Sequence, residues 1–141
     1  MIMRNKPMLL DFQTIPGKRK PNSALALPGH ATRTDADLES PIFPATVQQV
    51  RDAVVSIASR EPRTHLLHLD REAMQAEFEQ TSKVFRFPDK ITVAFEAVDA
   101  THATLSIYSR AKLGYYDFGV NRKRVQRWLS ELREMLGSAN A

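Results

Sequence analysis

The stretch HATLSIYSRAKLGYYDFGVNRKRVQRWLSELREML, residues 102–136, contains the two patterns that decide the fold. Its first nine residues alternate between apolar and polar, which is typical of a strand with one buried face. From Val125 onward, apolar residues recur every three or four positions, which is typical of an amphipathic helix. Gly137 follows as a natural end to that helix. The helical stripe consists of Val125, Trp128, Leu129, Leu132, Met135 and Leu136.

The segments before this stretch extend both patterns. Residues 64–69, 72–80 and 90–98 read as strands, and residues 98–101 form a link short enough for a hairpin with the strand at 102–110. An earlier helix is predicted over residues 46–60. It begins with Thr46 and Gln49, the spacing of a capping box, and Pro62 prevents its continuation.

These elements predict an α+β fold in the order arm, helix, four strands, helix. Strands joined by short links favour a mostly antiparallel sheet of about four strands, and the two helices should cover one of its faces as a two-layer sandwich. Six of the eight prolines lie in residues 1–44, so we expect an extended N-terminal arm there that wraps the domain. Residues 45–137 form the single α+β domain, and residues 138–141 are expected to be a disordered tail.

Composition narrows the function classes. The chain of 141 residues suits one domain, and its formal charge of +4 is too mild to indicate a nucleic-acid or membrane role without clustering. It has no cysteine, which excludes thiol catalysis and thiolate metal sites. The first ten residues lack the apolar run of a signal peptide, and no segment is long and apolar enough to cross a bilayer, so we expect a cytoplasmic protein.

The start of the closing helix carries an unusual charge pattern. Asn121, the expected N-cap, is followed by Arg122, Lys123 and Arg124, although the positive end of the helix dipole disfavours cations there. Two interpretations remain open. Either Asp117 and Asp89 neutralise these cations, or the site binds an external anion such as a phosphate or a carboxylate.

The candidate residues fall into two groups. The proposed ligand- or anion-binding residues are Arg110, Tyr116, Asp117, Asn121, Arg122 and Arg124. The proposed structural residues are Phe87, Asp89, Gly114 and Gly119, the two glycines supplying positive φ. No metal site and no cofactor are predicted.

The sequence favours a non-catalytic binding or assembly module that uses residues 110–124 to hold a small anion or a protein partner. A hydrolase or transferase that uses Asp117, Tyr116 and Arg122 is the alternative. A nucleic-acid-binding patch would combine residues 18–20 with residues 122–124, all six of which are cationic. The sequence argues against nucleic acid, because the expected outward sheet positions are acidic or neutral and no aromatic residues are interleaved with them.

Three motifs resemble those of the domain of unknown function 1499 family. They are Phe85-Arg86-Phe87-Pro88-Asp89, then Ser109-Arg110, and then the run from Gly114 to Val125 with its Gly, Asp, Gly, Asn and Arg positions. Pro21-Asn22-Ser23 is similar to an early Pro-Asn motif of the family, in which a cysteine often follows. The resemblance covers residues 20–136. It implies a short domain and carries over no biochemical activity.

Overall fold

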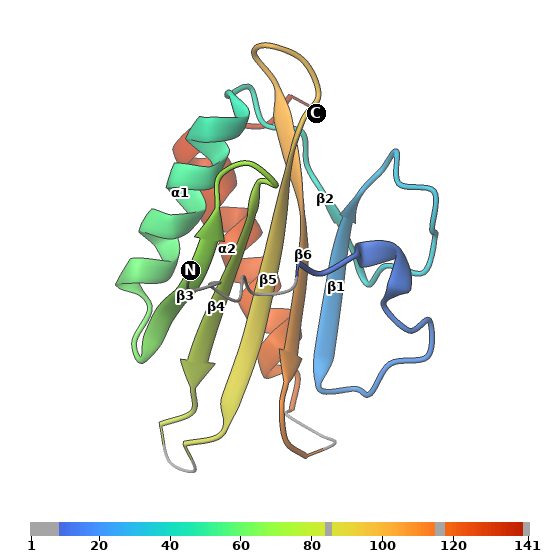
Figure 1. Ribbon diagram of the computed structural model, residues 1–141, viewed down its shortest axis with the longest axis vertical. Coiled ribbons are helices and arrows are strands. Elements are labelled where there is room, and N and C mark those ends of the chain that lie inside the picture. The colour runs from blue at the N-terminus through green and yellow to red at the C-terminus, as the bar shows by residue number, and fades with distance from the viewer. Residues whose placement is uncertain (1–8, 84–85, 115–117, 140–141) are drawn as a thin grey trace, which may run out of the picture.

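The computed structural model describes residues 9–83, 86–114 and 118–139 of the chain. In these residues, one six-stranded sheet in the order β2-β1-β6-β5-β4-β3 has two α-helices on one face (Figure 1). The elements are the 3-10 helix Phe12–Thr14, β1 Ser23–Pro28, β2 Leu38–Ser40, α1 Val47–Arg60, β3 Thr64–Asp70, β4 Gln75–Thr81, β5 Pro88–Ala97, β6 Ala103–Ala111 and α2 Val120–Leu136. None of the described helices combines the length and apolar character that crossing a bilayer requires.

The α+β class, the mostly antiparallel sheet and the placement of both helices on one face confirm the predicted class. The four predicted strands are β3 to β6, and β5 and β6 form the predicted hairpin. The predicted number of about four strands is wrong, because β1 and β2 add two more from within residues 1–44. β1 pairs antiparallel with β6, and β2 pairs parallel with β1.

β1 lacks a readable strand pattern because both of its faces are buried. Ala24 and Ala26 pack into the main core under the helices, whereas Leu25 and Leu27 pack against the arm on the other face. A strand buried on both faces is apolar throughout and shows no alternation. Its last residue, Pro28, stands at the strand end, where the missing amide donor is tolerated.

Of the two predicted N-caps, the one for α1 is confirmed and the one for α2 is wrong. α1 begins after Thr46, whose side chain and that of Gln49 form the predicted capping box. α2 ends at Leu136, and Gly137 is its C-cap, as predicted. Its N-cap, however, is Gly119 in the left-handed region at φ 78°, not Asn121. Asn121 lies inside the first turn and is buried, so its side chain serves the core rather than the cap.

Candidate functional site

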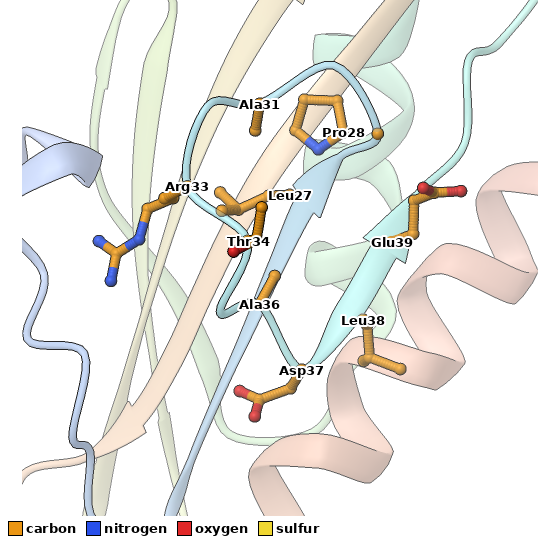
Figure 2. Close-up of a pocket in the computed structure, with 10 residues that line it drawn as sticks. Leu27, Pro28, Ala31, Arg33, Thr34, Ala36, Asp37, Leu38 and Glu39 are labelled. Atoms are coloured by element: carbon orange, nitrogen blue, oxygen red, sulfur yellow. The ribbon is translucent and has the colours of Figure 1, made fainter.

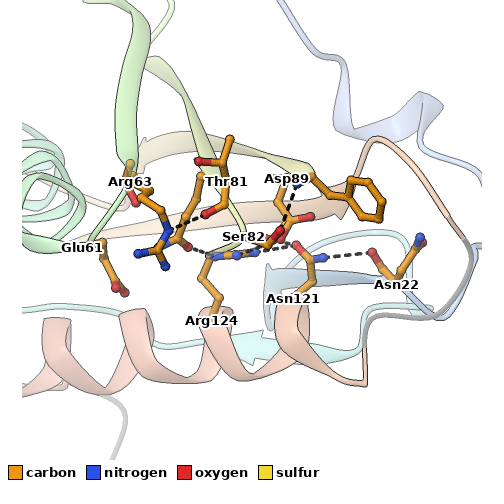
Figure 3. Close-up of polar contacts among 12 residues, drawn as sticks. Asn22, Glu61, Arg63, Thr81, Ser82, Asp89, Asn121 and Arg124 are labelled. Carbon is orange, nitrogen blue, oxygen red and sulfur yellow. Dashed lines mark hydrogen bonds and ion pairs between the residues drawn. The ribbon is translucent and has the colours of Figure 1, made fainter. Parts of the chain in front are cut away.

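The end of the sheet at which α2 begins contains a pocket of about 410 Å³. Four segments form it: the link from α1 to β3, the end of β4, the start of β5 and the first turns of α2 (Figure 3). Five cationic side chains and two carboxylates contribute to its lining. They are Arg63, Lys83, Lys123, Arg124 and Arg127, with Glu61 and Asp89.

Arg124 forms the floor of this site and is only 4% exposed. Its Nε donates to Gln80 Oε1 at 2.6 Å, and one terminal nitrogen donates to Asn121 Oδ1 at 2.7 Å and to Ser109 Oγ at 3.1 Å. The other terminal nitrogen donates to Asp89 Oδ2 at 2.8 Å (Figure 3). Every nitrogen of this guanidinium therefore has an acceptor, as a buried charge requires.

Asn121 joins this network to β1 and β6. Its Oδ1 accepts from Ser109 Oγ at 2.6 Å, and its Nδ2 donates to the carbonyl of Asn22 at 3.1 Å. The Nδ2 of Asn22 in turn donates to the carbonyl of Gly114 at 2.9 Å. Residues that are distant in the sequence, and that belong to separate motifs, thus meet in one buried polar network.

Glu61 also lines the pocket, on the link from α1 to β3. One of its oxygens accepts from Trp128 Nε1 at 2.9 Å and from two nitrogens of Arg127 at 2.9 and 2.7 Å. Burial alone would raise the pKa of Glu61, but the hydrogen bonds from Arg127 and Trp128 outweigh it, and the pKa is lowered. The carboxylate therefore stays charged and compensates Arg127.

The remaining cations of the pocket are not compensated in this way. Arg63, Lys83 and Lys123 are exposed, and none forms an ion pair with another described residue. The Nε of Arg63 donates to the carbonyl of Thr81 at 2.9 Å, which fixes the guanidinium beside the pocket (Figure 3). The pocket therefore presents an excess of positive charge over a floor that is already neutralised.

The structure does not bring all the predicted residues together. Arg110 lies on the sheet face opposite the helices, over the ring of Tyr108 at 4.6 Å, and donates to Thr92 Oγ1 at 2.9 Å. Burial lowers the pKa of Arg110. Arg122 lines a different pocket of about 420 Å³ together with Lys20. Among the candidates that lie within the described residues, Asn121, Arg124 and Asp89 meet. The ion pair of Asp89 with Arg124 agrees with the part of the first interpretation that concerns Asp89.

The other predicted residues are placed as follows. Tyr116 and Asp117 lie outside the described residues. Gly114 and Gly119 have φ of 82° and 78°, as expected. Phe87 is half-exposed, and its amide donates to Ser82 Oγ at 2.9 Å.

Sequence reasoning missed several contributors to the pocket, including Arg127 on α2. Glu61 and Arg63 belong to the link after α1, Gln80 belongs to the end of β4, and Lys83 belongs to the connection from β4 to β5. No local pattern marks these residues. The pairing of β4 with β5 could have found Gln80, because it places Gln80 opposite Asp89.

The nucleic-acid patch considered from the sequence is reduced by internal pairing. Arg19 donates to Asp35 and lies 3.7 Å from Asp37, and Arg124 is buried. Lys18, Lys20, Arg122 and Lys123 remain exposed.

Another pocket, of about 300 Å³, lies beside β1 where residues 29–39 return along it (Figure 2). Arg33 donates to both oxygens of Asp35 at 2.7 Å, and these hydrogen bonds hold the pKa of Asp35 well below its ordinary value. Asp37 accepts from the amide of Leu25 at 2.8 Å. The charged groups here satisfy one another, so this pocket is less suited to an external anion.

The family described as "Protein of unknown function (DUF1499)" matches residues 16–132, which is most of the chain. No curated protein matches this chain significantly. Among solved structures, the chain is similar to the di-domain ARO/CYC BexL from the BE-7585A biosynthetic pathway, with a TM-score of 0.50 and 16% identity over 67% of this chain and 44% of that chain. It also matches a START superfamily protein from Mycobacterium smegmatis, with a TM-score of 0.38 and 8% identity over 68% of this chain and 92% of that chain.

The chain thus spans less than half the length of BexL. At 16% identity, the likeness to BexL concerns the fold alone.

Proposed function

The chain belongs to this DUF1499 family, and we propose that it is a non-catalytic binding module that holds a small anion in the pocket at the start of α2. The observation that carries the proposal is the set of cations left without an acidic partner among the described residues. Arg63, Lys83 and Lys123 line the same pocket as the fully satisfied Arg124.

Charge and geometry favour a phosphate-like anion. The guanidinium of Arg63 is held by a backbone carbonyl and retains donors for a second acceptor. Lys123 lies in the first turn of α2, where the helix dipole also favours a negative charge. An anion in the pocket would relieve the repulsion among these cations, and charge-assisted hydrogen bonds to it are stronger than neutral ones.

Titration calorimetry with inorganic pyrophosphate tests the proposal. We expect the unmodified protein to bind and the double variant Arg63→Gln/Lys123→Gln to bind about tenfold more weakly or worse, because two charge-assisted contacts are lost. The matched control is Arg71→Gln/Arg133→Gln, which removes the same charge from exposed positions outside the pocket. No binding by the unmodified protein, or an equal loss in the control, would contradict the proposal.

The other functions considered from the sequence remain hypotheses. A hydrolase or transferase would depend on Tyr116 and Asp117, which lie outside the described residues. A protein partner or a nucleic acid could contact exposed cations such as Lys20 and Arg122, but no specific contact among the described residues favours either one. The cytoplasmic location also stays a prediction.

A further inference from the structure

Exposed apolar side chains gather on the loops at the end of the sheet where α2 begins. Phe118 is 94% exposed, Leu113 57% and Phe87 49%, and Val120 at the start of α2 is 46% exposed. Leu113 and Phe118 belong to the connection from β6 to α2, and Phe87 belongs to the connection from β4 to β5. Large apolar residues on loop tips contribute nothing to the core and call for another explanation.

The two connections lie side by side. The amide of Lys112 donates to the carbonyl of Pro88 at 3.1 Å, which places the first residue after β6 against the first residue of β5. Val120 and Lys83 line the same pocket, so the start of α2 also adjoins the connection from β4 to β5. The start of β5 and the end of β6 lie at the lower end of the molecule in Figure 1, opposite the hairpin between β5 and β6.

The backbone at these tips is strained. Phe118 has φ 56° and Arg86 has φ 58°, a region that side chains other than glycine seldom occupy. For a bulky residue such as Phe118, this conformation is a clear outlier. A strained residue that is also exposed gains no compensation from packing, and such strain is found at binding surfaces.

Cations surround these apolar side chains. Lys83, Arg86, Arg122 and Lys123 are all exposed, and none forms an ion pair with another described residue. Separate loop tips with one or two apolar side chains each, among cations, suit the interface of an anionic bilayer. There the apolar groups enter the acyl boundary and the cations remain at the phosphates.

We propose that this end of the molecule docks on an anionic lipid membrane. The apolar tip, defined as Phe87, Leu113, Phe118 and Val120, enters the interface, and a headgroup phosphate occupies the pocket beside Arg63 and Lys123. The inference deepens the proposed function and rests on it for the pocket, because it names a membrane surface as the source of the anion.

Flotation with vesicles of phosphatidylcholine, alone or mixed with phosphatidylserine, tests this inference. We expect binding to the mixed vesicles that weakens as salt screens the charges. The double variant Leu113→Ser/Phe118→Ser should bind the mixed vesicles about tenfold more weakly or worse, because it removes buried apolar area at the interface. The matched control is Leu67→Ser/Val98→Ser, whose side chains are 48% and 45% exposed outside the tip, and it should bind like the unmodified protein.

Pyrophosphate binding by the same proteins separates the two proposals. Leu113→Ser/Phe118→Ser should still bind pyrophosphate, which also shows that it is folded. If the unmodified protein binds pyrophosphate but does not float with the mixed vesicles, the membrane inference is overturned and the proposed function stands. If the unmodified protein binds neither pyrophosphate nor the mixed vesicles, both proposals are overturned. Unchanged vesicle binding by Leu113→Ser/Phe118→Ser would contradict the proposal that the apolar tip enters the membrane interface.

Discussion

At the scale of single residues, Arg124 shows how the chain accommodates a charge in its interior. One carboxylate, that of Asp89, balances the guanidinium, and three uncharged oxygens accept its other donors. Such an arrangement is stable only as a set, because removal of one partner leaves the others without their contacts. Arg124 is therefore a structural residue that shapes the pocket floor, and the pocket's excess charge comes from its exposed neighbours.

Replacing Arg124 with methionine tests this role. We expect Arg124→Met to lower the free energy of unfolding by about 3–5 kcal/mol, because Asp89 is left half-buried without its cation. Urea denaturation measures the change. Arg133→Met, at an exposed position on the same helix, should stay within about 0.5 kcal/mol of the unmodified protein.

The double variant Arg124→Met/Asp89→Asn serves as a second test of the same pair. It should recover part of the lost stability, because no uncompensated charge remains. A loss below about 1 kcal/mol for Arg124→Met alone would show that the buried network contributes little.

At the scale of secondary-structure elements, α2 begins on Gly119 rather than on a side-chain cap. Gly119 takes the left-handed conformation and makes no side-chain cap. Asn121, which has the right side chain for capping, is instead bonded to Ser109 and Arg124. The helix thus forgoes a local cap, and the side chain that could provide it holds the helix against the sheet.

Gly119→Ala tests how much the left-handed backbone conformation at the start of α2 depends on glycine. A methyl group at this position meets no atom of the described residues within 4 Å, so the expected loss comes from the backbone conformation. We expect the free energy of unfolding in urea to fall by about 1–2 kcal/mol, because φ is 78°. Gly119→Asn should lose less, since asparagine tolerates the left-handed region. Equal or greater stability of Gly119→Ala would show that α2 can start with another geometry.

At the scale of the whole molecule, the N-terminal segment contributes a strand to the sheet and an apolar cluster to the sheet face away from the helices. β1 completes the sheet beside β6, and Ile15, Leu25 and Leu27 form a second apolar cluster on the face away from the helices. The predicted division into an extended arm at 1–44 and a domain at 45–137 stays a prediction. A variant in the arm measures how strongly the arm contributes to the stability of the domain.

Ile15→Ala is that variant. Ile15 is 5% exposed in the second cluster, so the loss of its side chain should lower the free energy of unfolding in urea by about 2–4 kcal/mol in one cooperative transition. Leu9→Ala, at a position that is 39% exposed, is the control and should have little effect. A change below about 0.5 kcal/mol at Ile15 would indicate an arm that separates from the domain without affecting it.

The sequence by itself determined the elements whose signals are local. The Thr46 capping box, the apolar stripe of α2 and the strand patterns each depend on residues within a few positions of one another. The capping box, α2 and the four strands were confirmed, although Met135 of the stripe is 47% exposed. The tertiary structure decided the rest. β1 shows no alternation because both of its faces are buried. Two of the partners of Arg124, Asp89 and Gln80, lie 35 and 44 positions away in the sequence. Such contacts depend on which strands become neighbours, and no short window of sequence contains that information.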